Sequence, residues 1–71
     1  MGEPLWPYER VLNDLRRRID NGEITGQLPT RLILAGEYGV SHMTVQRAID
    51  QLKEDGLVQS VAGLGVFVKP R

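Results

Sequence analysis

The chain has 71 residues, no cysteine, and nine basic and nine acidic residues, so its formal net charge is zero. This length allows one small domain, residues 1–71, with a single modest core, and excludes a second lobe or a deep enzyme cleft. The lack of cysteine excludes disulfide bonds and thiolate metal sites. No apolar run approaches the roughly 20 residues that cross a bilayer, and the N-terminus lacks the pattern of a secretory signal, so we expect a cytoplasmic location.

The first helix is expected over about residues 7–22. Pro7 is a residue favoured at the first position of a helix, and Gly22 can end the helix in the left-handed conformation. Between these two residues, apolar side chains recur at helical spacing and predict one buried stripe, formed by Tyr8, Val11, Leu12, Leu15 and Ile19.

A short link and a second helix follow. Gly26 and Pro29 prevent the first helix from continuing, so residues 23–29 are expected to be extended, with Ile24 and Leu28 turned inward. The hydroxyl of Thr30 is well suited to cap a helix, which predicts a second helix over about residues 30–38.

A glycine turn separates this second helix from a third. Gly39 allows the chain to turn sharply, and the hydroxyl of Ser41 can cap a helix over about residues 42–55. The two helices and their turn have the spacing of a helix-turn-helix motif, in which the third helix is the recognition helix. Its buried stripe is predicted at Val45, Ala48, Ile49 and Leu52.

The opposite face of the third helix carries polar side chains in its first half. His42, Thr44, Gln46 and Arg47 can form hydrogen bonds with base edges or phosphates, and Met43 could pack on a thymine methyl group. Acidic residues appear only from Asp50 onward. This order suits a helix that enters the major groove by its N-terminal end. The alternative is a capped surface helix with no role in binding.

The periodicity changes after Gly56. Two β-rich runs within about residues 57–69, joined by the segment 62–65, predict a β-hairpin. Three helices followed by a hairpin define an α+β, mostly α, winged helix-turn-helix fold. The tip of such a wing, at Gly63, Leu64 and Gly65, can lie against the minor groove or the flanking phosphates. The alternative is a hairpin that only covers the core.

The basic residues are unevenly distributed. Arg16, Arg17 and Arg18 form a run in the first helix, and we interpret at least two of them as part of a solvated helix face. Four others lie in segments that would approach DNA, namely Arg31, Arg47, Lys69 and Arg71.

Four groups of residues together resemble the N-terminal DNA-binding domain of GntR-type bacterial transcription regulators over nearly the whole chain. They are Pro7-Tyr8 with Leu15 and Ile19; Gly22-Glu23-Ile24 with Leu28-Pro29; Leu34-Ala35, Tyr38-Gly39-Val40-Ser41, Thr44-Val45 and Ala48; and Gly56-Leu57-Val58 with Gly63, Gly65, Phe67 and Val68. The resemblance implies a repressor domain that binds double-stranded operator DNA as a homodimer. It also implies a C-terminal effector domain that is absent from this chain and supplies most of the dimer contact, so the isolated domain is expected to be monomeric.

The chain departs from the family pattern at three positions that usually hold arginine, where it has Leu32, His42 and Gln46. The neutral Gln46 cannot make the bidentate cationic contact with guanine, and it suits adenine instead. Arg31 and Arg47 lie one position away from two of the usual arginines, so we expect them to replace part of the missing charge.

The predicted DNA-binding residues come from the second helix, the recognition helix and the wing tip. They are Thr30, Arg31, Ser41, His42, Met43, Thr44, Gln46, Arg47, Gly63, Leu64 and Gly65.

We expect no catalytic, cofactor-binding or metal-binding residues, because one histidine and no cysteine leave no constellation for such chemistry. A second hypothesis is that the winged helix binds another protein. The zero net charge and the apolar Met43 and Leu64 favour that alternative.

Overall fold

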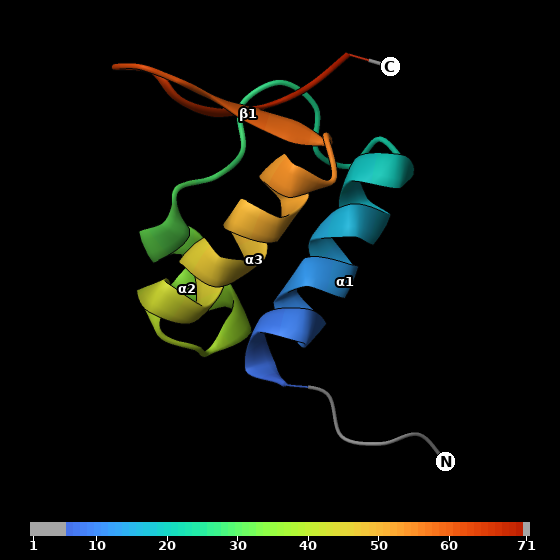
Figure 1. Cartoon of the computed structure of the whole chain (residues 1–71). Coiled ribbons are helices and arrows are strands. Elements are labelled where there is room, and N and C mark those ends of the chain that lie inside the picture. The colour runs from blue at the N-terminus through green and yellow to red at the C-terminus, as the bar shows by residue number, and fades with distance from the viewer. Residues whose placement is uncertain (1–5, 71) are drawn as a thin grey trace.

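The computed structural model describes residues 6–70, which form three helices followed by two strands. The helices are α1 (Pro7–Asp20), α2 (Arg31–Tyr38) and α3 (His42–Glu54), and the strands are β1 (Val58–Val61) and β2 (Gly65–Val68). Helix α3 packs against both α1 and α2, and the two strands lie across the end of the molecule where α1 and α3 finish (Figure 1). The predicted fold, three helices and an antiparallel β-hairpin wing, is confirmed.

Helix α1 is closed at both ends by local hydrogen bonds. At its start, the carboxylate of Glu9 accepts a hydrogen bond from the backbone N–H of Trp6 at 3.0 Å. The helix ends at Asp20, slightly before the predicted Gly22, and the N–H groups of Asn21 and Gly22 donate to the carbonyls of Arg17 and Ile19 in its last turn. Gly22 has a φ of +80°, the left-handed conformation expected of a glycine that ends a helix.

Both helices of the helix-turn-helix pair begin with a hydroxyl cap, as predicted. Thr30 Oγ1 accepts a hydrogen bond from the N–H of Ile33 at 3.3 Å, and Ser41 Oγ accepts one from the N–H of Thr44 at 3.2 Å. Between the two helices, Gly39 has a φ of +66°, a conformation that a residue with a Cβ atom adopts at a cost. These three local signals fix where α2 begins, where it ends and where α3 begins.

The core lies between the helices and the first strand. The stripes predicted on α1 and α3 are buried, except that Tyr8 is only half-buried at the edge of its stripe. Ile24 and Leu28 are also buried, which confirms that the link turns both side chains inward. None of the helices within residues 6–70 has the length and apolarity needed to span a membrane. The buried core consists of Val11, Leu12, Leu15, Ile19, Ile24, Leu28, Leu34, Val45, Ala48, Ile49, Leu52 and Val58.

The link between α1 and α2 adds backbone pairing to the wing that the sequence did not reveal. Strands β1 and β2 are antiparallel and place Val58 opposite Val68. On the other side of β2, the N–H of Leu28 donates to the carbonyl of Val66 at 2.8 Å, and the N–H of Val68 donates to the carbonyl of Gly26 at 2.7 Å. The link therefore runs beside β2 and holds the wing against the helices (Figure 1).

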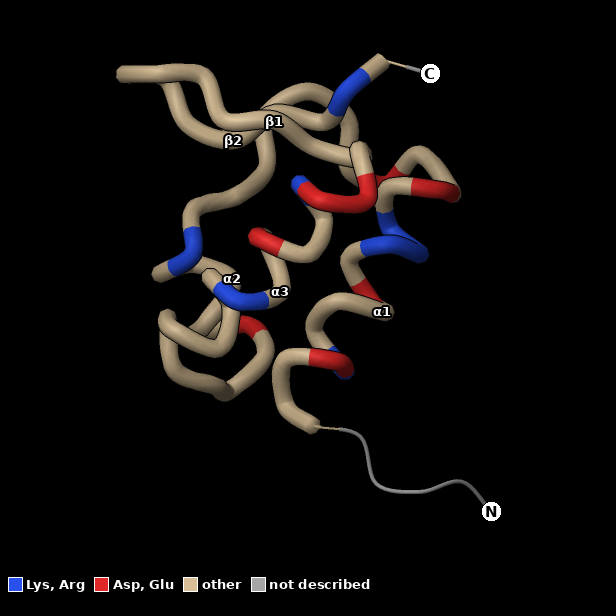
Figure 2. The backbone as a smooth tube through the Cα atoms, in the orientation of Figure 1, with Lys and Arg blue, Asp and Glu red and all other residues tan. Residues whose placement is uncertain are grey.

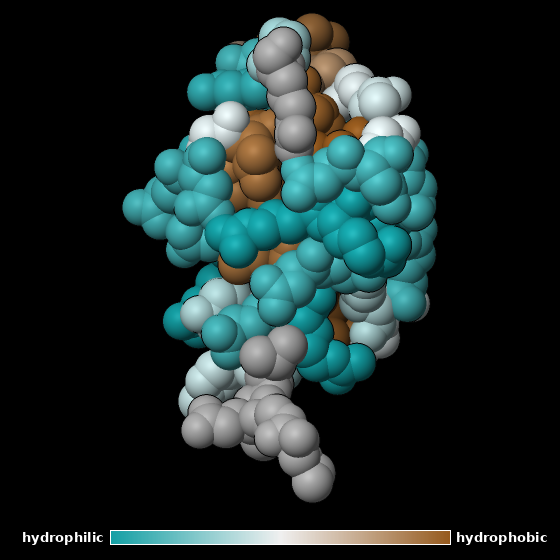
Figure 3. Space-filling view, turned by 90° about the vertical axis from the view of Figure 1, so that its right-hand side faces the viewer, coloured by the Kyte–Doolittle hydropathy of each residue, from teal (hydrophilic) through white to brown (hydrophobic). Residues whose placement is uncertain are grey.

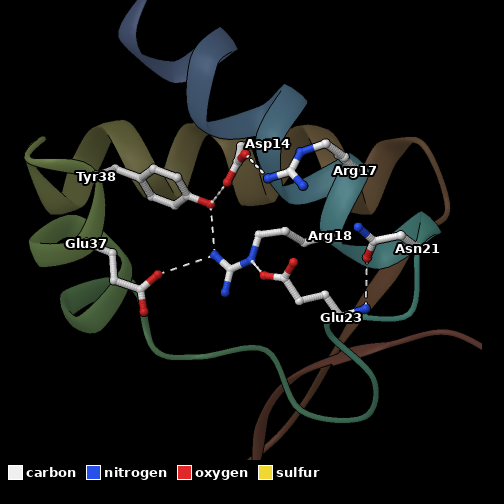
Figure 4. A network of polar contacts seen from close by, with 7 residues as sticks. All are labelled: Asp14, Arg17, Arg18, Asn21, Glu23, Glu37 and Tyr38. Carbon is white, nitrogen blue, oxygen red and sulfur yellow. Dashed lines mark hydrogen bonds and ion pairs between the residues drawn. The ribbon is translucent and has the colours of Figure 1, made fainter.

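A polar network joins α1 to α2 (Figure 4). The hydroxyl of Tyr38 donates to Asp14 at 2.5 Å and accepts from Arg18 at 2.9 Å, and Arg18 also pairs with Glu23 at 2.7 Å and with Glu37 at 3.3 Å. The network therefore ties the end of α2 and the link to the same side of α1.

The network changes the titration of its members. Hydrogen bonds from Arg17 and Tyr38 hold the pKa of the Asp14 carboxyl below its usual value. Burial, together with the hydrogen bond to Asp14, raises the pKa of the Tyr38 hydroxyl. The hydrogen bond that Arg18 donates to the Tyr38 hydroxyl is the main cause of the raised pKa of Arg18. The neutral phenol, the carboxylate and the guanidinium therefore form one set of mutually stabilised groups.

Candidate nucleic-acid interface

An open groove of about 650 Å³ follows the N-terminal half of α3. Its walls come from the start of α1, the start of α2 and the exposed side of α3. The residues that line it are Trp6, Pro7, Tyr8, Arg31, His42, Met43, Thr44, Gln46, Arg47 and Asp50.

A second groove of about 250 Å³ leads from α3 to the wing tip. Arg31 and Gln46 line both grooves, so the two join into one surface, which we call the two-groove surface. All of the predicted DNA-binding residues line it except Ser41 and Gly63. The second groove is lined by Gln27, Leu28, Pro29, Thr30, Arg31, Gln46, Ile49, Leu64, Gly65 and Val66.

The polar face of α3 points outward. His42 and Arg47 are exposed, Met43 is 72% exposed, and Gln46 is half-buried. Ser41, which lines neither groove, has a structural role as the cap of α3, and its hydroxyl also lies 3.0 Å from that of Thr44. The first half of α3 thus presents its polar side chains to the exterior and leaves them accessible to a partner.

Gln46 lies between two charged neighbours. Arg31 Nη1 donates to Gln46 Oε1 at 3.0 Å, and Gln46 Nε2 donates to Asp50 Oδ1 at 2.8 Å. The sequence pattern assigned Asp50 to the part of α3 beyond the contact region, but the structure places Asp50 in the lining of the first groove. The side chains that surround Gln46 therefore include an acid as well as a base.

The start of α1 contributes aromatic residues that the sequence analysis did not include in the site. The guanidinium of Arg47 lies over the ring of Tyr8, 4.0 Å from its centroid, in a cation–π contact. Trp6 is 70% exposed at the same edge of the groove. Tyr8 has both an aromatic ring and a polar hydroxyl and lies at the margin of the apolar stripe, which could have indicated a role at the surface. The sequence pattern predicts it only as a core residue.

The wing tip is held to the link by a side chain. Gln27 Nε2 donates to the backbone carbonyl of Leu64 at 2.8 Å, and the side chain of Leu64 remains 64% exposed. Gly65 has a φ of +124°, and a Cβ atom there would lie 2.9 Å from Gln27 Nε2. The φ of +124° favours glycine at position 65, and the hydrogen bond from Gln27 holds the wing tip next to the second groove.

The arginine run of α1 is paired with acids. Arg16 pairs with Asp55, whose pKa is lowered by this contact, and Arg17 pairs with Asp14. Arg17 is exposed and Arg16 is half-buried, whereas the side chain of Arg18 is mostly buried in the network of Figure 4. The α1 side is mainly hydrophilic, and hydrophobic atoms show mostly near the end that carries the sheet (Figure 3).

The charges of the two-groove surface lie apart from the arginine run (Figure 2). Arg31 is the first residue of α2 and Arg47 lies near the middle of α3, while Lys69 lines a different groove beside Ile19 and Ile24. Arg71 lies outside the described residues. Within residues 6–70, His, Asp and Glu side chains form no group of three or more that could hold a metal ion.

The fold, the capped α3 and the wing beside it define a winged helix-turn-helix domain. Solved structures of similar shape include the N-terminal domain of AraR in complex with mutant ORR3, with a TM-score of 0.88 and 34% identity over 96% of this chain and 100% of that one. A second is the DNA-binding domain of AraR in complex with operator ORE1, with a TM-score of 0.87 and 34% identity over 97% of this chain and 89% of that one.

Residues 7–68 match the sequence profile of "Bacterial regulatory proteins, gntR family", and the chain belongs to this family. Among its relatives are the mannosyl-D-glycerate transport/metabolism system repressor MngR of Escherichia coli, 38% identical over 87% of this chain, and the transcriptional repressor NagR of Bacillus subtilis, 35% identical over 96%. The chain spans only 27% and 29% of the lengths of these two relatives.

Proposed function

We propose that the two-groove surface binds double-stranded operator DNA and that the chain is the DNA-binding domain of a transcriptional repressor. The observation that carries this proposal is the single surface that contains both the polar first half of α3 and the wing tip. The repressor relatives and the AraR–operator complexes support it.

The dimensions of the surface suit a duplex. Helix α3 has 13 residues and is therefore about 20 Å long, and the major groove of B-DNA admits a helix of this kind. In this arrangement the first half of α3 contacts base edges. The wing tip, at Gly63, Leu64 and Gly65, lies against the neighbouring minor groove or phosphates.

The side chains of the surface have separate roles. Arg31 and Arg47 neutralise phosphates, and His42, Thr44 and Gln46 form hydrogen bonds with bases or phosphates. Met43 packs on a thymine methyl group. Thr30 and Ser41, at the two helix starts, place free backbone N–H groups near the phosphates.

The whole protein is proposed to act in the bacterial cytoplasm as a homodimer. Because the chain spans about a quarter of each repressor relative, we infer that a C-terminal effector domain supplies most of the dimer contact and senses a small molecule. The domain by itself is then a monomer and binds weakly, because one module with few cations gains little from neutralising phosphates.

The test is a titration of isotope-labelled protein with duplexes enriched by selection from a randomised pool, at two salt concentrations. Backbone amide shifts confined to residues 30–47 and 62–65, weakening with salt, support the proposal. The absence of any shift at millimolar duplex would contradict it and would favour a protein-interaction module, for which the exposed Met43 and Leu64 offer an apolar contact.

A further inference from the structure

The two hydrogen bonds of Gln46 determine which way its carboxamide points. Arg31 carries only donors and the carboxylate of Asp50 only acceptors, whereas a carboxamide has a donor end and an acceptor end. With the oxygen toward Arg31 at 3.0 Å and the nitrogen toward Asp50 at 2.8 Å, both contacts are satisfied. A flipped amide would place its N–H groups against the guanidinium and its oxygen against the carboxylate. The pair of charges therefore allows one orientation only.

The fixed amide retains binding capacity. Its oxygen has two lone pairs and its nitrogen two hydrogens, so one acceptor and one donor stay free after the contacts with Arg31 and Asp50 are made. In the major groove, adenine presents a donor at N6 beside an acceptor at N7, whereas guanine presents two acceptors. A free glutamine can turn its N–H₂ group toward guanine, but a fixed one holds its oxygen toward one of the guanine acceptors.

We propose that Arg31 and Asp50 are positioning residues that set the direction in which Gln46 reads a base pair. The amide oxygen, on the α2 side, accepts from adenine N6, and the amide nitrogen, on the Asp50 side, donates to adenine N7. The half-site therefore contains adenine on one strand at this position and rejects guanine and the reversed pair. This inference rests on the proposed binding of DNA and adds to it the identity and polarity of one base contact.

The experiment compares base preferences of four proteins selected against one pool of randomised duplexes. Gln46→Ala identifies the position that Gln46 reads, because only that position loses its preference. Asp50→Asn keeps the size of the side chain but supplies a donor as well as an acceptor, so the orientation of the Gln46 amide is then held by Arg31 alone and the amide flips more readily. Glu54→Gln is the matched control, since it removes one negative charge from an exposed residue of the same helix for which no contact with Gln46 is present.

The two charge-removing variants separate positioning from simple electrostatics. Both should bind duplexes more tightly than the parent, because each loses one repulsion from the phosphates. Only Asp50→Asn should weaken the preference for adenine at the Gln46 position, by up to about tenfold, the discrimination typical of one bidentate contact. An Asp50→Asn protein with the parent's adenine preference, or a parent that selects another base at this position, overturns the inference. A parent that enriches no sequence overturns the proposed function itself.

Discussion

The guanidinium of Arg47 lies 4.0 Å from the centre of the Tyr8 ring and joins the exposed face of α3 to the first turn of α1. Arg16, Arg17 and Arg18 pair with carboxylates, whereas Arg47 rests on an aromatic face. A ring face orients a cation without cancelling its charge. The charge of Arg47 is therefore not paired with a carboxylate, which suits the phosphate contact proposed for it.

Replacing Arg47 with alanine should weaken binding to every duplex to a similar extent. Loss of one phosphate contact should reduce the slope of the logarithm of affinity against the logarithm of salt concentration by about 0.9. The control is Arg17→Ala, which removes an arginine that lies outside the two-groove surface. The measurement is affinity over a salt series, and an unchanged slope for Arg47→Ala would remove this residue from the interface.

Replacing Tyr8 should weaken binding without changing the number of phosphate contacts. Tyr8→Leu removes the ring under Arg47, and a cation–π contact at an exposed site contributes about 0.5–1 kcal/mol. We expect a loss of affinity of about two- to fivefold with an unchanged salt slope. Tyr8→Phe keeps the ring and should bind like the parent. If the leucine and phenylalanine variants bind equally, the ring does not position Arg47.

Two glycines of the helix-turn-helix motif should respond in opposite directions to alanine. Gly39 has a φ of +66°, so Gly39→Ala should destabilise the fold by about 1–2 kcal/mol, the cost of the left-handed conformation. Gly36 lies within α2, and Gly36→Ala should stabilise the fold by about 0.5–1 kcal/mol. A Cβ atom meets nothing within 4 Å at either site, so the backbone conformation alone decides whether alanine stabilises or destabilises the fold. Urea unfolding measures the change in the free energy of unfolding for both variants. Changes of the same sign would contradict the backbone conformations assigned to Gly36 and Gly39.

The network around Tyr38 should contribute stability that acid removes. The folded-state pKa of Asp14 is lowered from 3.8, so its contribution is present above about pH 4 and is lost as the pH falls through the lower, folded-state pKa. Tyr38→Phe removes one of the hydrogen bonds to this carboxylate and should cost about 1 kcal/mol at neutral pH.

The difference in the free energy of unfolding between parent and Tyr38→Phe should narrow as the pH falls below about 4, where Asp14 becomes protonated in both. Urea unfolding of both proteins, from about pH 7 down to about pH 2, measures this difference in the free energy of unfolding. A difference that stays constant over this range would show that Asp14 does not contribute through its charge. Asp55, whose pKa is lowered by Arg16, titrates in both proteins and serves as an internal reference.

Local signals in the sequence were sufficient to predict the helices. The caps at Thr30 and Ser41 and the turn at Gly39 act within a few residues, and the stripe on α3 depends only on helical periodicity. For the same reason, the exposed polar face of α3 could be predicted together with its buried face.

Contacts between segments distant in the sequence could not be predicted in this way. The pairing of Gly26 and Leu28 with β2 uses backbone atoms, which every residue carries, so no residue type reveals it. The contact between Arg47 and Tyr8 depends on how α1 crosses α3. The sequence predicts Asp50 outside the site, because the order of charges indicates only how far a residue lies along α3. It does not indicate which side chains contact that residue.

The backbone bonds between the link and β2 have a mechanical consequence. Leu28, which is hydrogen-bonded to β2, lies only two residues before Thr30, the N-terminal cap of α2. A tilt of the hairpin on contact with a phosphate would therefore pull on the first turn of α2 and displace Arg31. Contact at the wing and the hydrogen bond between Arg31 and Gln46 should then change together.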